Sequence, residues 1–252
     1  MATLHAINVS GYIKMKNTLY VLTIVLTLGC QTNNSKTASL NSTSNGTETG
    51  TNRKAIKSSV VTRTYISDST YLDYDFQTSL KCGFKLEYRV YTESNKKDTL
   101  QTIFLINDTI EIKDLTGGSS YSLIHKNIGY IGADFDSSFV FVQSFGSGNP
   151  HKIQLIDKKT GETLRNGVWV DANEENQVLL YIENINESNE RLKIFDIENN
   201  TETIVNDFQD CKCVQFAIAG LRDCVSIDSV TQQYIILESS YEDDKIEKKY
   251  NR

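Results

Sequence analysis

The clearest structural signal in this chain lies in residues 131–164, which read IGADFDSSFVFVQSFGSGNPHKIQLIDKKTGETL. A shift of 39 residues, without a gap, places them on residues 170–203, which read VDANEENQVLLYIENINESNERLKIFDIENNTET. FVFV then falls on VLLY, and IQLID falls on LKIFD. Short apolar runs of this kind, separated by polar loops, predict β-strands. Each copy is therefore expected to be a small unit of several strands, with an Asp opening the turn after its third run.

The chain around the repeat has the same character. Strand-like runs recur at residues 60–66, 84–91 and 102–106, and turn-forming residues separate them. Before residues 241–252, which we interpret as a charged C-terminal tail, no amphipathic helical pattern is convincing. The sequence thus predicts an all-β globular domain of antiparallel strands over residues 58–240.

Weaker echoes of the repeat occur at residues 110–117 (IEIKDLTG) and 225–228 (VSID). Periods near 40 residues with several strands per unit are typical of propeller blades. The pattern resembles the blades of WD40-type and related β-propellers, although the Trp-Asp and Gly-His signatures of that family are absent. The resemblance implies a propeller-like arrangement of about five units. A β-sandwich or a meander barrel is the alternative, because strand pairs alone can imitate a repeat.

The N-terminus has the order of an export signal. Lys14 and Lys16 precede the apolar run LYVLTIVLTL at residues 19–28, which is too short to span a bilayer, where ~20 apolar residues are needed. Met15 is an alternative start. The run ends in Leu-Thr-Leu-Gly-Cys30, which resembles the lipobox of bacterial lipoproteins. The resemblance implies that residues 1–29 are cleaved off and that Cys30 carries a diacylglycerol and acyl chains such as palmitate. An ordinary secretory leader and an uncleaved core segment are the alternatives.

Residues 30–57 follow as a tether. Eighteen of residues 31–57 are Ser, Thr, Asn, Gly or Gln, so the segment has too little apolar surface to fold. A flexible chain of this length spans roughly 30 Å. Without residues 1–29 the chain has 24 basic and 32 acidic residues, which argues against nucleic acid as a partner.

Four cysteines follow Cys30: Cys82, Cys211, Cys213 and Cys224. An even number in an exported protein permits two disulfides. Cys211 and Cys213 are too close to pair easily, so we expect one of them to pair with Cys224 and the other with Cys82. Half of a metal or redox site is the alternative, but the only histidines after the leader are His125 and His151. No metal or cofactor is expected.

Trp169 and His151 are the candidate ligand contacts. Trp169 could provide a stacking platform for a sugar ring, or simply be a core residue. His151 closes the loop of residues 146–151 and has no evident nucleophile partner. Residues 73–75 and 134–136 alternate Asp with an aromatic residue, as calcium loops alternate acids, but lack the other features of an EF-hand. We interpret them as solvated acids, and we identify no catalytic residue.

These observations favour a lipid-anchored protein of the bacterial cell envelope, with the outer membrane as the expected location. Its leading interpretation is a non-enzymatic module that binds a protein or a glycan through loops of the β domain. A hydrolase acting on glycans or peptidoglycan, and a purely structural envelope component, are the alternatives.

Overall fold

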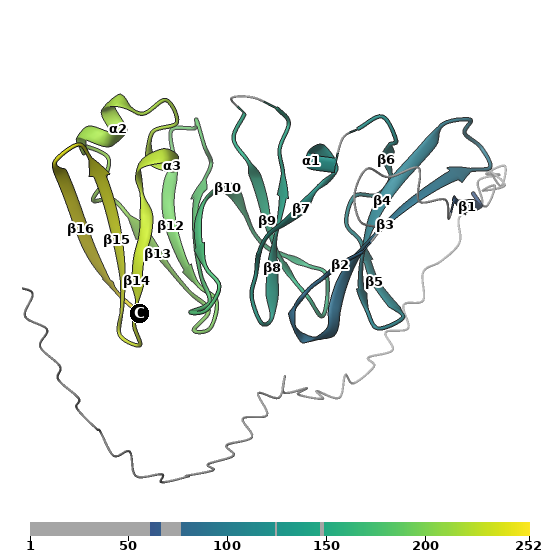
Figure 1. Ribbon diagram of the computed structural model, residues 1–252, viewed down its shortest axis with the longest axis horizontal. Coiled ribbons are helices and arrows are strands. Elements are labelled where there is room, and N and C mark those ends of the chain that lie inside the picture. Colours follow the sequence, from purple (N-terminus) through teal and green to yellow (C-terminus); the bar gives the residue numbers. More distant parts are fainter. Residues whose placement is uncertain (1–60, 67–76, 124, 147–148) are drawn as a thin grey trace, which may run out of the picture. The chain divides into compact units, whose positions relative to one another are not determined.

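A computed structural model of the chain describes residues 61–66, 77–123, 125–146 and 149–252 (Figure 1). The leader, Cys30, the tether and residues 73–75 lie outside this part of the chain. The described elements are β1 (Arg63–Ile66), β2 (Gln77–Ser79), the 3-10 turn η2 (Lys81–Gly83), β3 (Phe84–Glu93), β4 (Thr99–Asn107), β5 (Ile110–Asp114), β6 (Ser119–Ser120), α1 (His125–Ile128), β7 (Tyr130–Asp134), β8 (Ser138–Gln143), β9 (Lys152–Asp157), β10 (Thr163–Asn173), β11 (Val178–Glu183), β12 (Arg191–Asp196), β13 (Thr201–Val205), α2 (Lys212–Phe216), α3 (Leu221–Cys224), β14 (Ser226–Val230), β15 (Tyr234–Tyr241) and β16 (Asp244–Asn251).

The prediction of an all-β fold with antiparallel strands is confirmed. The strands form sheets of six, seven and three strands, and every pairing is antiparallel. Among the described residues no sheet closes into a barrel, and no strand of the first sheet pairs with the last. The propeller-like arrangement therefore stays a prediction.

The seven-stranded sheet is two units joined by one long strand. The first part of β10 pairs with β9, from Thr163 to Val168, and the second part pairs with β11, from Val168 to Asn173. Gly167 lies where the strand changes partner, and a Cβ there would meet the carbonyl oxygen of Ile182 at 2.5 Å. Glycine therefore permits a close backbone approach at the crossover.

The strands are thus arranged in four successive groups, each of which we call a leaf. The first contains β1–β6, the second β7–β9 with the first part of β10, the third the second part of β10 with β11–β13, and the fourth β14–β16. A separate apolar cluster lies between each leaf and the next. Phe139 packs with the first leaf, Leu179 with the second, and Leu180 with the fourth. The leaves are thus held together mainly by burial of their facing apolar side chains.

The structure shows that the gapless alignment of the two copies is wrong in the second strand of the repeat. The third strands, β9 and β12, follow the 39-residue shift, and Ile156 and Phe195 face the preceding leaf in both copies. In the second strands, however, Phe139 corresponds to Leu179 rather than to Val178, because Val178 faces the following leaf. A slip of one residue in a strand exchanges its two faces. The hairpin between β10 and β11 is longer than the corresponding hairpin between β7 and β8, and this difference in length produces the slip.

The C-terminus also differs from the prediction. Residues 241–252 are not a separate tail, because β16 pairs with β15 along its whole length (Figure 1). Ile246 and Tyr250 pack against the apolar cluster between the third and fourth leaves, while Lys245 and Lys249 are exposed. Although this segment is rich in charged residues, it forms a strand whose side chains alternate between the core and solvent.

Candidate functional site

A pocket of about 240 Å³ lies between β10 and α3. It is lined by His151, Trp169, Val170, Arg222 and Asp223. The structure therefore brings together both residues that the sequence singled out as ligand contacts. It adds an arginine and an aspartate from a helix that the sequence analysis did not predict.

Trp169 is positioned by β10, the strand that crosses between the second and third leaves. Its backbone N–H donates a hydrogen bond to the carbonyl oxygen of His151, at 2.9 Å, which holds the two residues together. A β-bulge follows at once, between Trp169 and Asp171, and bulges re-aim the side chains beside them. The indole is half-buried, packing against the cluster between the second and third leaves while it lines the pocket. The core and ligand-contact interpretations of Trp169 are thus compatible.

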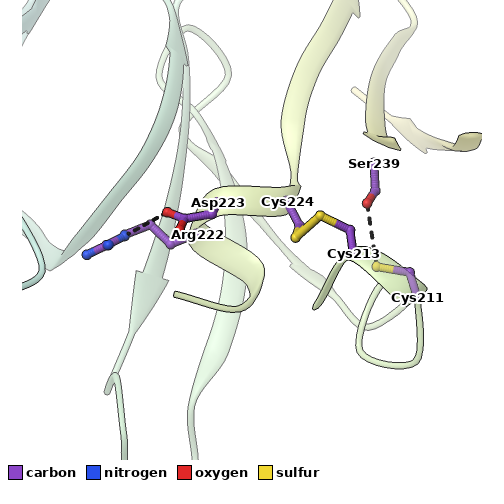
Figure 2. Close-up of a disulfide and its surroundings, with 6 residues drawn as sticks. All are labelled: Cys211, Cys213, Arg222, Asp223, Cys224 and Ser239. Carbon is purple, nitrogen blue, oxygen red and sulfur yellow. Dashed lines mark hydrogen bonds and ion pairs between the residues drawn. A yellow bond between two sulfur atoms is a disulfide. The ribbon is translucent and has the colours of Figure 1, made fainter. Parts of the chain in front are cut away.

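Arg222 and Asp223 are supplied by α3, a helix of four residues. Its Leu221 and Cys224 are buried, so the polar residues between them are directed away from the core. The Arg222 Nε lies 3.4 Å from the Asp223 Oδ1 (Figure 2). The pocket therefore offers an aromatic surface beside one cation and one anion.

A disulfide fixes this helix. Cys224, its last residue, is bonded to Cys213 in α2, with the two Cα atoms 5.7 Å apart (Figure 2). The backbone N–H of Ile227 also donates to the Asp171 carboxylate, at 2.8 Å, and ties the next strand to β10. The disulfide joins α3 to α2 within the connection between β13 and β14, and the bond from Ile227 crosses from the fourth leaf to the third. Together they position the two walls of the pocket.

The expected bridge between Cys82 and the remaining cysteine of the Cys-Lys-Cys pair is not formed. Cys211 is a free, buried thiol whose Sγ lies 3.5 Å from the Ser239 Oγ (Figure 2). It packs between the third and fourth leaves, whereas Cys82 lies in η2, ahead of the first leaf's β3. The two residues therefore belong to different parts of the fold.

Of the two aspartates at residues 134–136, Asp136 is exposed, whereas Asp134 has a structural role. The Asp134 carboxylate accepts a hydrogen bond from the backbone N–H of Lys81, at 2.7 Å, and pairs with the buried Lys158 ammonium, at 2.7 Å. These contacts join the first and second leaves. Asp134 is therefore a half-buried partner in a polar cluster rather than the solvated acid that we predicted.

A second acidic group comprises Asp228, Glu238 and Glu247 of the fourth leaf, whose carboxylates lie within 4.8 Å of one another. The Lys245 ammonium lies 2.9 Å from Glu238 and 2.7 Å from Glu247. A lysine thus already compensates part of this negative charge, and the group gives no independent reason to assign a metal.

Sequence reasoning missed Arg222 and Asp223 because they lie more than 50 residues from Trp169, in too short a helix to show a periodic pattern. The signal available was the apolar segment CVQFAIAGLRDC at residues 213–224, closed by two cysteines and ending in an adjacent Arg–Asp pair.

Comparison of the chain with protein-family models, with curated proteins and with solved structures found no match. Within the described ranges, none of the helices has the length and apolar character needed to cross a membrane.

Proposed function

We propose that this chain is a lipid-anchored cell-envelope protein whose β domain is a non-enzymatic binding module. The observation that carries the proposal is the pocket in which Trp169 lies beside His151 and the Arg222–Asp223 pair. Small-ligand sites combine an apolar wall with a few convergent polar groups, and this pocket has that composition.

A sugar ring is the ligand that best fits this combination. One face of a pyranose is rich in C–H groups and can stack on an indole, while its hydroxyls both donate and accept hydrogen bonds. Arg222 supplies donors and Asp223 supplies acceptors beside the indole. Glycoside hydrolysis usually needs two carboxyl groups. The pocket lining includes a single one, Asp223, which favours binding over cleavage.

The anchor rests on the leader and on Cys30. Several acyl chains on one residue would hold the protein on a membrane, because each buried CH₂ contributes ~0.8 kcal/mol. Radioactive palmitate should label the wild type but not Cys30→Ala. Equal labelling of the two proteins would remove this part of the proposal.

Ligand binding can be measured by calorimetry with soluble peptidoglycan fragments and a panel of neutral and acidic oligosaccharides. Asp223→Asn and Arg222→Met should weaken binding about 10- to 100-fold, because a hydrogen bond to a charged group contributes ~1.5–3 kcal/mol. Trp169→Ala should weaken it further. Tyr65→Ala, which truncates an exposed aromatic on the first leaf, is the control. Absence of binding across the panel, or binding unchanged in all three pocket variants, would contradict a glycan site.

A further inference from the structure

The segment between the disulfide cysteines displays two large apolar side chains to solvent. Ile218, between α2 and α3, is fully exposed, and Phe216 is 67% exposed. Their neighbours Val214 and Ala217 instead pack against the cluster between the third and fourth leaves. The segment is thus attached by some of its apolar residues while it presents others outward. We call Phe216 and Ile218 the apolar tip.

Several contacts hold the tip in this position. The Cys213–Cys224 disulfide closes the segment, and the backbone N–H of Ala217 donates to the carbonyl oxygen of Cys213, at 2.8 Å. The Phe216 ring stacks on Tyr241 of β15, with ring centroids 5.4 Å apart. The tip is therefore a constrained surface feature, and a binding partner would not have to order it first.

The size of the tip indicates what kind of partner it fits. A stable protein interface buries roughly 800 Å² on each partner, and two side chains supply only a small part of that area. A lipid bilayer needs no complementary shape and accepts small apolar protrusions at the boundary between headgroups and acyl chains. Near the tip, Lys212 is paired with Asp244, at 3.4 Å, and the acidic residues Glu242 and Asp243, which follow Tyr241, are exposed, so the tip carries no excess of positive charge. This favours a neutral membrane surface over an anionic one.

We propose that the apolar tip inserts into the surface of the membrane on which the chain is anchored. The inference rests on the proposed lipid anchor for the nearness of that membrane. The tether expected from the sequence would keep the domain within reach of the bilayer, so even a weak contact would be populated through high effective concentration. Insertion of the tip would fix which side of the domain faces the lipid.

The test places a reporter at the tip and another at a matched distant site. Ile218→Trp is compared with Ile110→Trp, since Ile110 is 68% exposed and begins β5 in the first leaf. Each full-length chain, expressed with its leader, is reconstituted into phosphatidylcholine vesicles with or without bromine on the upper acyl chain. The wild type gives the emission of Trp169 as background. The emission added by Ile218→Trp should be lost in brominated vesicles, whereas that added by Ile110→Trp should be retained.

Flotation of the same vesicles separates failure of the tip from failure of the anchor. If the chains float and both added emissions persist, the tip proposal is wrong while the anchor stands. If Cys30→Ala floats as the wild type does and the tip emission is still quenched, the anchor is wrong and the tip stands. Chains that do not float overturn both. A wild-type dimer in sedimentation that Ile218→Asp disperses, but Ile110→Asp does not, would identify a second copy as the occupant and overturn the membrane contact.

Discussion

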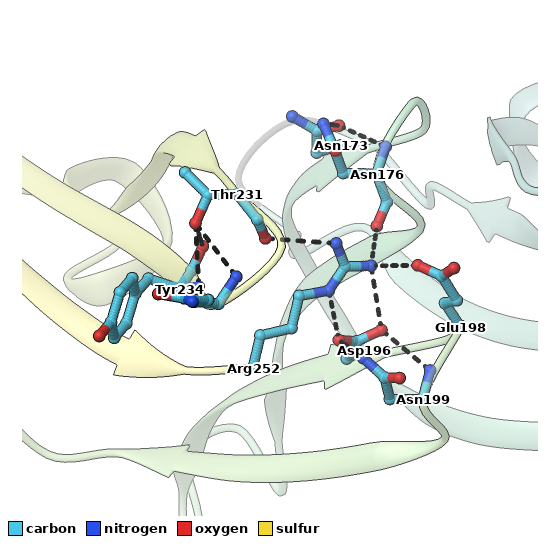
Figure 3. Close-up of polar contacts among 9 residues, drawn as sticks. Asn173, Asn176, Asp196, Glu198, Asn199, Thr231, Tyr234 and Arg252 are labelled. Atoms are coloured by element: carbon cyan, nitrogen blue, oxygen red, sulfur yellow. Dashed lines mark hydrogen bonds and ion pairs between the residues drawn. The ribbon is translucent and has the colours of Figure 1, made fainter.

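The guanidinium of Arg252 is joined to the carboxylate of Asp196, with Nε 2.6 Å from Oδ2 (Figure 3). Both side chains are almost completely buried. Arg252 also donates to the Glu198 carboxylate and to the carbonyl oxygen of Asn176, in the third leaf, and to that of Thr231 beyond β14. The last residue of this sequence therefore connects the third leaf to the fourth.

Loss of the Arg252 side chain should destabilise the fold strongly. Arg252→Ala leaves the buried Asp196 carboxylate without its cation, and removal of one partner of a buried pair costs about 3–5 kcal/mol. The matched control is Arg191→Ala, because Arg191 is exposed at the start of β12 and a surface change there should cost little. Urea unfolding measures both free energies. Similar losses in the two variants would contradict the role assigned to Arg252.

The pair of Asp196 and Arg252 should also make the free energy of unfolding depend on pH in the acidic range. Burial alone would raise the pKa of Asp196, but hydrogen bonds from Arg252 and Asn199 outweigh it and hold the pKa below the ordinary 3.8. A carboxyl group whose pKa is lowered by folding contributes stability above its unfolded pKa, and this is lost as the pH falls through the folded value. The stability difference between wild type and Asp196→Asn should therefore shrink as the pH is lowered from 7 to below 3.8. A difference that stays constant over this range would show that the Asp196 charge is not responsible.

Lys158 should be a second site of large destabilisation. Its side chain is completely buried, and its ammonium lies 2.7 Å from Asp134 and donates to the carbonyl oxygens of Phe135, Asp136 and Lys81. Burial lowers the pKa of Lys158, although the contact with Asp134 opposes this shift. Lys158→Met removes the cation and leaves these acceptors without it, so the free energy of unfolding should fall by about 3–5 kcal/mol.

Lys159, the next residue, is exposed and provides the control. Lys159→Met should have little effect in the same urea experiment. Adding Asp134→Leu to Lys158→Met should recover part of the loss, since it removes the uncompensated carboxylate. If the double variant is no more stable than Lys158→Met, the two residues do not act as a pair.

The turns show what the sequence could predict. The Asp157 carboxylate accepts hydrogen bonds from the backbone N–H groups of Lys159 and Thr160, as the Asp and Gly of this turn indicated. Asp196 caps its own turn in the second copy through the N–H of Asn199. Such contacts span two or three residues, so a local sequence pattern can predict them. The bond from Arg252 to Asp196 spans 56 residues, and no local pattern could reveal it.

The candidate site was predictable only in part, for the same reason. Trp169 and His151 could be singled out as unusual residues in strand and loop, but their meeting depends on how β10 crosses between leaves. Arg222 and Asp223 reach the pocket through a disulfide whose pairing the sequence left open. Register, crossover and disulfide pairing are long-range properties of the chain, and they decide which side chains share a pocket.

Removal of the Cys213–Cys224 disulfide should release α3 from the pocket. A helix of four residues is not stable by itself, so its position depends on the disulfide and on burial of Leu221. The double variant Cys213→Ser/Cys224→Ser should lose about 2–4 kcal/mol of stability. Trp169 is the one tryptophan in the sequence and lines the pocket beside α3, so its emission should shift to the red as water reaches the ring. Cys211→Ala removes a buried thiol that forms no disulfide, and it should leave the emission unchanged. If the emission of the double variant matches that of the wild type, α3 keeps its place without the disulfide and the covalent link does not position Arg222 and Asp223.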